Sequence, residues 1–141
     1  MNTAKETQNP IEKVNDFLTQ AGTFYMSTVD GDKPKCRPLG FHLLENDKIY
    51  FGVGDFKDVY KQMRKNPQVE FCATGDGGFL RYYGRAVFED NDAIAQKALA
   101  AAPSLQQIYN ETTGYKLAIF HLEDATAEFR GMLDVKECYH F

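Results

Sequence analysis

Apolar residues near the start of the chain recur every three or four positions, the spacing of one face of a helix. Asn9 stands before them as an N-cap residue, Pro10 suits the first helical position, and Gly22 supplies a stop. We therefore predict one short amphipathic helix between Asn9 and Gly22, after a flexible leader over residues 1–8. The apolar face of this helix comprises Ile11, Val14, Phe17 and Leu18.

Beyond the helix, apolar residues change to the period of two that is typical of strands. An Asp30-Gly31 turn separates two such stretches, so we predict that they pair as an antiparallel hairpin, and a third strand follows after a further turn. Alternation within the second strand places Arg37 and Leu39 on one face and Pro38 on the other. The predicted strands span Thr23–Val29, Pro34–Leu44 and Lys48–Val53.

The rest of the chain combines helices with a second hairpin. Asp55 is predicted to cap a second helix, a glycine-rich turn at residues 75–78 joins two strands, and a third helix stops at Pro103. A long final strand is predicted to be kinked at Glu123-Asp124. Because hairpins join consecutive strands, this order favours an antiparallel barrel that carries helices over a βαβ sheet, in one domain over residues 9–141. The predicted helices span Phe56–Lys65 and Asp90 or Asn91 to Pro103, and the strands span Val69–Thr74, Phe79–Phe88 and Tyr115–Phe129.

The composition narrows the class of protein. With 141 residues, of which 43% are hydrophobic and 13% aromatic, the chain is the size of one domain with a single core, built from Phe and Tyr because it has no Trp. A net charge of −4 argues against general attraction to nucleic acid or anionic membranes. The sequence shows no signal peptide or membrane span, so we expect a cytoplasmic protein. Three widely spaced cysteines predict neither a disulfide framework nor a zinc site.

The most unusual stretch is KPKCRPLGFH, residues 33–42, which places three cations and two prolines in a predicted strand. Its cations Lys35 and Arg37 are joined by Lys57 and Lys61 near a predicted helix start. Such groups are suited to hold a phosphate, because forked or point-charge donors and the N–H groups of a helix N-terminus all bind anions. The alternative interpretation is that these cations form a solvated helix face and a strand edge on which lysine discourages pairing with another strand. The residue pattern alone leaves both interpretations open.

Other chemistry has little support in the sequence. The motifs of α/β-hydrolases, zinc peptidases, P-loop proteins and dinucleotide-binding folds are absent. His42, His121 and His140 lie far apart along the chain, so we do not expect them to form a metal site. We interpret His42 as a hydrogen-bonded wall residue rather than an acid or base. Cys36 lies between cations but has no neighbouring base that would make it a nucleophile.

Several segments follow one another in a characteristic order, namely TFYMSTVDGDKPKCRPLGF, KIYFGV, VYKQMRKNPQVEF and GRAVFED, before an Ala-rich helix that ends in AAPSL. In amino-acid sequence and order they resemble the pyridoxamine 5′-phosphate oxidase-like family of FMN-binding split barrels, and within it the short, stand-alone bacterial members. The similarity covers about residues 11–129. It implies a mainly β fold, a six-stranded antiparallel split β-barrel with three peripheral helices. It also implies a homodimer with one FMN at each of two equivalent sites between the subunits.

The resemblance assigns roles to individual residues. Arg37 matches the family's second-strand arginine, which contacts the FMN phosphate, and the strand backbone that lies against the isoalloxazine maps onto Pro38 and Leu39. Phe79 and Arg81 fall where the long hairpin of a second subunit often approaches the flavin. The end of the third strand and the start of the next helix complete the phosphate site, and they match Val53, Gly54, Lys57 and Lys61.

The chain departs from the family pattern at two places. The Ser-Arg-Lys triplet common at the helix start in oxidase members is Lys57-Asp58-Val59 here, and the C-terminal Trp and Arg-x-His substrate residues are missing. We therefore expect an FMN-dependent oxidoreductase other than pyridoxamine 5′-phosphate oxidase itself, which passes hydride or electrons from NADH or NADPH to a small acceptor. No catalytic residue is assigned. The alternatives are a flavin- or haem-binding protein without turnover and a structural dimer without a cofactor.

Overall fold

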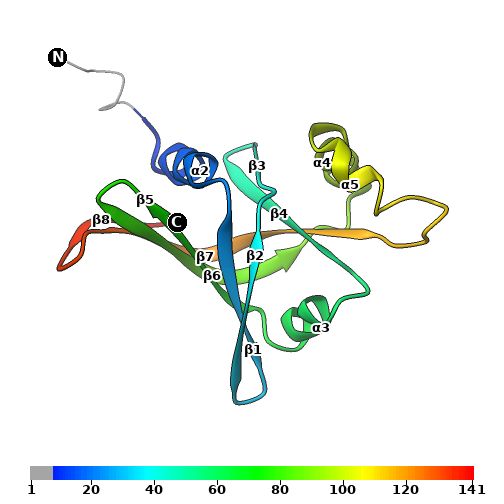
Figure 1. Cartoon of the computed structure of the whole chain (residues 1–141), viewed down its shortest axis with the longest axis horizontal. Coiled ribbons are helices and arrows are strands. Elements are labelled where there is room, and N and C mark those ends of the chain that lie inside the picture. The colour runs from blue at the N-terminus through cyan, green and yellow to red at the C-terminus, as the bar shows by residue number, and fades with distance from the viewer. Residues whose placement is uncertain (1–7) are drawn as a thin grey trace.

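The computed structural model describes residues 8–141 and shows a mainly β protein with helices at its periphery (Figure 1). Within these residues, eight antiparallel strands form one sheet in the order β2-β1-β5-β6-β7-β4-β3, and β8 pairs with β7. None of the described helices is long and apolar enough to cross a membrane. The strands are β1 (Phe24–Asp30), β2 (Lys33–Leu39), β3 (Leu43–Glu45), β4 (Lys48–Gly54), β5 (Gln68–Gly75), β6 (Gly78–Phe88), β7 (Leu117–Arg130) and β8 (Val135–His140). The helices are α2 (Pro10–Ala21), α3 (Asp58–Lys65), α4 (Asp92–Ala101) and α5 (Pro103–Gln106).

The sheet curls around a core of aromatic side chains. Phe24 on β1 lies 5.9 Å from Phe51 on β4, and Phe51 stacks on Phe71 of β5 at 4.1 Å between ring centroids. Three strands separate β1 from β4 in the sheet, so these contacts require the sheet to fold back on itself. The predicted core of Phe and Tyr is confirmed, since Phe24, Phe51, Phe71 and Phe120 are among the largest fully buried side chains.

The expected six strands and three helices are corrected to eight and four among residues 8–141. The predicted second strand ends at Leu39, and β3 forms separately because it pairs with β4 through a turn in which Asn46 and Asp47 adopt positive φ angles of 54° and 59°. The tail after residue 130 adds β8. The backbone pairing does not close the sheet into a barrel, because β2 and β3 remain its two ends.

The boundaries of the helices follow local chemistry. Asn9 caps α2 by accepting the Ile11 N–H at 3.0 Å, and Gly22 ends that helix with φ 77°, as predicted. Helix α3 begins at Asp58, later than expected, and its N-cap is Lys57 rather than Asp55. Asp55 instead contacts the segment before β7: its N–H donates to the Lys116 carbonyl at 3.0 Å, and its side-chain Oδ1 accepts the Lys116 N–H at 3.4 Å. The predicted cap at Asp55 is therefore wrong.

The predicted kink in the last strand is confirmed as a bulge. The register between β6 and β7 shifts between Tyr83 and Arg85, and Asp124 opposite this point has φ 52°. Gly84 permits the close approach, because a Cβ atom there would lie 2.9 Å from the Ala125 Cα. The bulge bends β7, which pairs with both β6 and β4.

Candidate functional site

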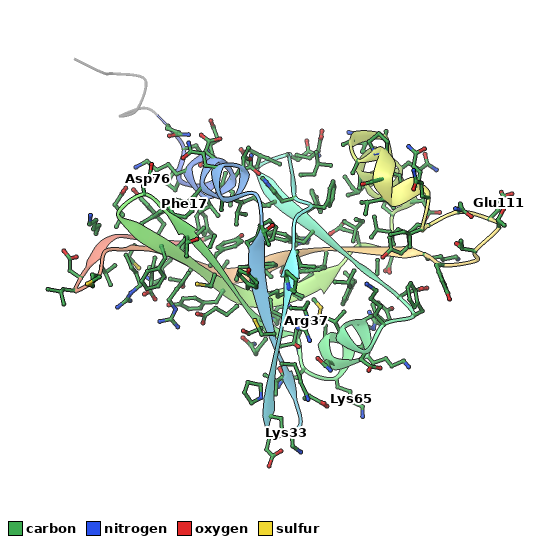
Figure 2. The ribbon with its side chains drawn as sticks, viewed as in Figure 1. Phe17, Lys33, Arg37, Lys65, Asp76 and Glu111 are labelled. Carbon is green, nitrogen blue, oxygen red and sulfur yellow. The ribbon has the colours of Figure 1, made fainter. Side chains whose placement is uncertain are left out.

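Arg37 lies midway along β2, on the face of the sheet that is turned toward the core. Its cross-strand partner is Met26 on β1, whose own partner on β5 is Phe71, and both of these side chains are fully buried. Side chains opposite one another in an antiparallel pair share a face, so the backbone directs Arg37 inward. Figure 2 shows Arg37 on the β1–β2 hairpin, with Lys33 at its tip and α3, which carries Lys65, to one side.

Three neutral oxygen atoms hold the Arg37 guanidinium. Nη1 donates to Thr28 Oγ1 at 2.7 Å and to the Met26 carbonyl at 3.2 Å, and Nη2 donates to Gln62 Oε1 at 3.1 Å. Thr28 is only 2% exposed, and its hydroxyl donates to the same Gln62 Oε1 at 2.7 Å. We call Arg37, Thr28 and Gln62 together the arginine clamp. It joins β2, β1 and α3 by side-chain hydrogen bonds.

No carboxylate neutralises the arginine clamp. Among residues 8–141, no Asp or Glu oxygen lies within 4.0 Å of the Arg37 guanidinium nitrogens. Burial lowers the pKa of the Arg37 guanidinium, which nevertheless stays charged, as arginine does in proteins. A half-buried positive charge without an anionic partner lacks the compensation that buried charges normally have.

The clamp leaves part of the guanidinium available. Arginine carries five N–H donors, and three of those of Arg37 are used by Thr28, Met26 and Gln62. The Nε–H and the second Nη2–H have no partner within residues 8–141, and these two nitrogens lie side by side. Paired N–H groups of this kind bind phosphate or carboxylate in a bidentate manner.

A cleft of about 300 Å³ lies next to the clamp, at the junction of the β1–β2 hairpin and α3. Gln62 lines it and also contacts Arg37, so the cleft and the clamp share a side chain. Of the predicted cations, Lys61 lines this cleft, whereas Lys57 is the exposed N-cap residue of α3 and lies outside the lining. The lining residues are Asp30, Asp58, Lys61, Gln62 and Lys65.

The predicted residues on β4 are explained in part by packing. Val53 is 4% exposed and its side chain belongs to the core, so only its backbone is available to a ligand. Gly54 is required by its neighbours, because a Cβ atom there would lie 2.7 Å from the Phe56 ring and 3.0 Å from the Tyr109 hydroxyl oxygen. The absence of a side chain at Gly54 therefore does not by itself indicate a ligand.

Pro38 and Leu39 point to opposite faces of β2. Leu39 is half-buried and packs on the core, on the same face as Arg37, whereas Pro38 is exposed on the outer face. Because β2 ends the sheet, no strand of the described part of the chain lies beside one of its edges. Pro34 and Pro38 lack N–H groups, which discourages a further strand from pairing there.

Phe79 and Arg81 are not brought to the clamp within one chain. They lie on β6, and β1 and β5 separate β6 from β2. Arg81 is paired with Glu70 through two hydrogen bonds of 2.6 and 3.0 Å. Phe79 lines a different cleft, of about 260 Å³, with Phe17. Their approach to the flavin from a second subunit stays a prediction.

Thr28 and Gln62 are not among the predicted site residues. Strand alternation contained a signal for Thr28, because it placed this hydroxyl on the face of Phe24 and Met26, where an unpaired polar group would be costly. Gln62 had a similar signal, since it lies three residues after the apolar Val59 and so on the same side of the helix. Neither signal says that the two side chains meet.

The other candidate residues have structural partners. His42 is a wall residue, as predicted, because its Nδ1 lies 2.7 Å from Asn15 Oδ1 and its Nε2 lies 3.2 Å from Thr19 Oγ1. Cys36 is an exposed free thiol. In the part of the chain that the structure describes, no three His, Cys, Asp or Glu side chains are grouped so that they could hold a metal ion.

Solved structures share this fold over nearly the whole chain. A NimC/NimA family protein from Clostridium acetobutylicum matches with a TM-score of 0.85 at 25% identity, over 100% of both chains. A haem-binding protein from Mycobacterium smegmatis matches with a TM-score of 0.67 at 14% identity, over 94% of this chain and 58% of that one. A pyridoxamine 5′-phosphate oxidase-related, FMN-binding protein from Nostoc punctiforme matches with a TM-score of 0.58 at 13% identity, over 96% and 98%.

The sequence itself gives a family assignment. No curated protein matches it. Residues 10–127, however, match the family described as pyridoxamine 5′-phosphate oxidase, and this stretch runs from the start of α2 into the second half of β7. The resemblance seen in the sequence is therefore confirmed: the chain belongs to the pyridoxamine 5′-phosphate oxidase family.

Proposed function

We propose that the protein is an FMN-binding oxidoreductase in which Arg37 anchors the phosphate of the flavin. The observation that carries this proposal is the Arg37 guanidinium, which no carboxylate among residues 8–141 neutralises and which has two N–H donors without a partner there, in a chain of this family. An FMN-binding protein of the same fold lends support to the choice of cofactor.

The residues around Arg37 fit one phosphate group. A phosphate monoester carries about −1.5 to −2 charges at pH 7 and three acceptor oxygens, so it can accept both remaining N–H groups and neutralise the guanidinium. Lys61 offers a further positive charge at the cleft that Gln62 shares. Asp58 already supplies a negative charge to the first turn of α3. Arg37, rather than the N-terminus of α3, is therefore the main anchor in this proposal.

The remaining predicted contacts belong to the same proposal. The free edge of β2 at Pro38 and Leu39 lies next to Arg37 in sequence and would face the ring system, together with the backbone of Val53 and Gly54. Lys57 would contribute a weaker, solvent-exposed charge. Phe79 and Arg81 would come from the second subunit of a homodimer, because a single chain keeps them away from the clamp.

When bound, the flavin supplies the redox chemistry, because its ring system accepts and releases hydride or electrons. The residues of this chain bind the phosphate and orient the ring. We propose NADH or NADPH as the electron donor and a small molecule as the acceptor, in the cytoplasm. Pyridoxamine 5′-phosphate oxidation itself is not proposed, because the sequence lacks Trp and carries Lys57-Asp58-Val59 at the helix start.

A second candidate is a cofactor-binding protein without turnover. It is favoured by the fold shared with the haem-binding protein from Mycobacterium smegmatis. His42, the histidine on the stretch after β2, already has a partner at each ring nitrogen. Binding of haem through His42 would therefore require both of these contacts to be replaced.

The absorbance spectrum of the purified protein, recorded before and during titration with FMN, tests the proposal. We expect a flavin spectrum, present at purification or formed on titration, that is bleached anaerobically by NADH or NADPH. A protein that is colourless and leaves the absorbance and fluorescence of added FMN unchanged would contradict it. A flavin spectrum without bleaching would favour the candidate without turnover, and a Soret band on haem addition would favour its haem-binding form.

A further inference from the structure

Gln62 makes both of its contacts within the arginine clamp through one atom. Its Oε1 accepts a hydrogen bond from Thr28 Oγ1 at 2.7 Å and another from Arg37 Nη2 at 3.1 Å. Gln62 lies on α3 between the buried residues Val59 and Met63, so the packing of the helix fixes the position of the amide. The clamp therefore holds Arg37 from a rigid element, through side chains that carry no charge of their own.

Position 62 is the place where a carboxylate would neutralise Arg37. Glu matches Gln in length, and its carboxylate could accept the same two hydrogen bonds, which would then be charge-assisted and stronger. Glu70 plays this part for Arg81, with contacts of 2.6 and 3.0 Å. The neutral Gln62 leaves the charge of Arg37 available instead.

We propose that Gln62 and Thr28 are positioning residues that make the site at Arg37 selective for a phosphorylated ligand. They hold the guanidinium by its Nη1–Nη2 edge and leave the Nε–H and one Nη2–H for the phosphate. Because both side chains are neutral, they do not compete with the phosphate for the charge. The inference rests on the proposed flavin function, in which this pair makes FMN preferred over riboflavin, the same ring without the phosphate.

Two physical effects support this role. A guanidinium that is already fixed loses less conformational freedom when the ligand binds, and binding benefits from such preorganisation. Half-burial also lowers the local dielectric constant, so that a charge on Arg37 attracts a phosphate more strongly than a fully hydrated lysine would. The second effect requires Arg37 to be held by neutral groups, because a carboxylate would fix the guanidinium but also neutralise its charge.

The test is Gln62→Glu, compared with Gln107→Glu as the matched control. Gln107 is exposed at the end of α5, so the control makes the same change in net charge away from the clamp. In Gln62→Glu, we expect the preference for FMN over riboflavin, measured as the ratio of their Kd values, to fall by roughly 10- to 100-fold. Riboflavin binding should stay the same, and Gln107→Glu should behave like the wild type.

A second variant separates orientation from charge. Thr28→Val removes one acceptor of Arg37 and the donor to Gln62 while it keeps the size of the side chain and the positive charge. We expect an intermediate loss of FMN preference, on the order of 3- to 10-fold. Thermal unfolding of each variant checks that it is folded. A purely structural role would change the unfolding temperature without changing the ratio of the two Kd values.

Inorganic phosphate distinguishes a failure of this inference from a failure of the flavin proposal. We expect phosphate to raise the unfolding temperature of the wild-type apoprotein but not that of Gln62→Glu. Suppose that the wild type binds neither FMN nor riboflavin, but that phosphate still raises its unfolding temperature and not that of Gln62→Glu. The proposed role of Gln62 is then supported, and the flavin proposal fails. If folded Gln62→Glu keeps the wild-type preference for FMN, the positioning role is overturned while the flavin proposal stands.

Discussion

Arg37 and Arg81 lie in the same sheet, yet among the described residues only Arg81 has a carboxylate that neutralises its charge. Arg81 donates from Nε and Nη2 to the Glu70 carboxylate at 2.6 and 3.0 Å, and this pairing raises its pKa. Within residues 8–141, Arg37 has only the neutral oxygens of Thr28, Met26 and Gln62 as partners, and burial lowers its pKa. The Nε–Nη2 edge that Glu70 occupies on Arg81 is the edge that stays open on Arg37.

The difference teaches that the partners of an arginine indicate its role better than its place in a sequence. Both residues were predicted to contact a flavin. Arg81 has a carboxylate partner within the folded chain, so a structural role already accounts for its position. Arg37 is held in place with no anion among the described residues. The comparison therefore predicts that phosphate recognition depends on Arg37 and not on Arg81.

The largest effect is expected from Arg37→Met. Removal of the charged donors should weaken FMN binding by about 1.5 to 3 kcal/mol, the range for hydrogen bonds to charged groups, and leave riboflavin binding unchanged. Fluorescence titration with both flavins measures this. Arg81→Met is the matched control. Even if Arg81 contacts the ring from a second subunit, this variant should keep the preference for FMN over riboflavin. A loss of that preference would contradict the claim that phosphate recognition does not depend on Arg81.

A smaller effect is expected when Arg81 is made to resemble Arg37. In Glu70→Gln the guanidinium loses its carboxylate partner. Because both side chains of this pair are about a third exposed, at 39% and 34%, water screens the interaction. The free energy of unfolding in urea should therefore fall by less than about 1 kcal/mol. A changed preference for FMN in this variant would contradict the separation between the two arginines.

The lysines should matter less than Arg37. Lys61 is exposed at the cleft and has no fixed geometry toward the clamp, so Lys61→Met should weaken FMN binding by about 0.5 kcal/mol, and this difference should vanish at high salt. Isothermal titration at two salt concentrations measures it. Lys35→Met, which removes an exposed cation from β2, is the control. An effect of Lys61→Met as large as that of Arg37→Met would make the lysine the anchor.

The smallest expected effect is on the stability of the protein in acid. Hydrogen bonds from Tyr83 and Arg130 lower the pKa of Glu128 on the outer face of the sheet. A carboxyl group whose pKa is lowered on folding stabilises the protein above its usual pKa, and this contribution is lost as the pH falls through the lowered value. Glu128→Gln should therefore reduce the loss of stability in acid by less than about 1 kcal/mol, as measured by urea unfolding across pH. An unchanged pH dependence would show that Glu128 does not contribute.

The positions of most elements could be predicted because their signals are local. The Asn9 cap, the Gly22 stop and the kink at Asp124 all depend on residues close together in sequence, and the structure confirms them. The division of the predicted second strand after Leu39 could not be predicted, because β3 is defined by its pairing with β4. The hydrogen bond between His42 and Asn15, which ties the intervening stretch to α2, is likewise tertiary.

The site was predictable only as far as its charged residue. Residues 33–42 stood out because they place three cations and two prolines in a predicted strand, and the family resemblance singled out Arg37 among them. Thr28 and Gln62 are 34 residues apart, and their contact exists only once α3 packs beside β1. The missing carboxylate could not be inferred either, because Glu70 looks as available as any other acidic residue until the register of the strands places it on the face of Arg81 and not on that of Arg37.

The most direct test of the central claim is an equilibrium titration of the wild-type protein with FMN and with riboflavin under the same conditions. If Arg37 is kept charged for a phosphate, FMN should bind at least roughly tenfold more tightly, as expected for charged hydrogen bonds worth about 1.5 kcal/mol or more. Equal affinities for the two flavins would contradict the account, because they would show that the phosphate makes no net contact with the arginine clamp.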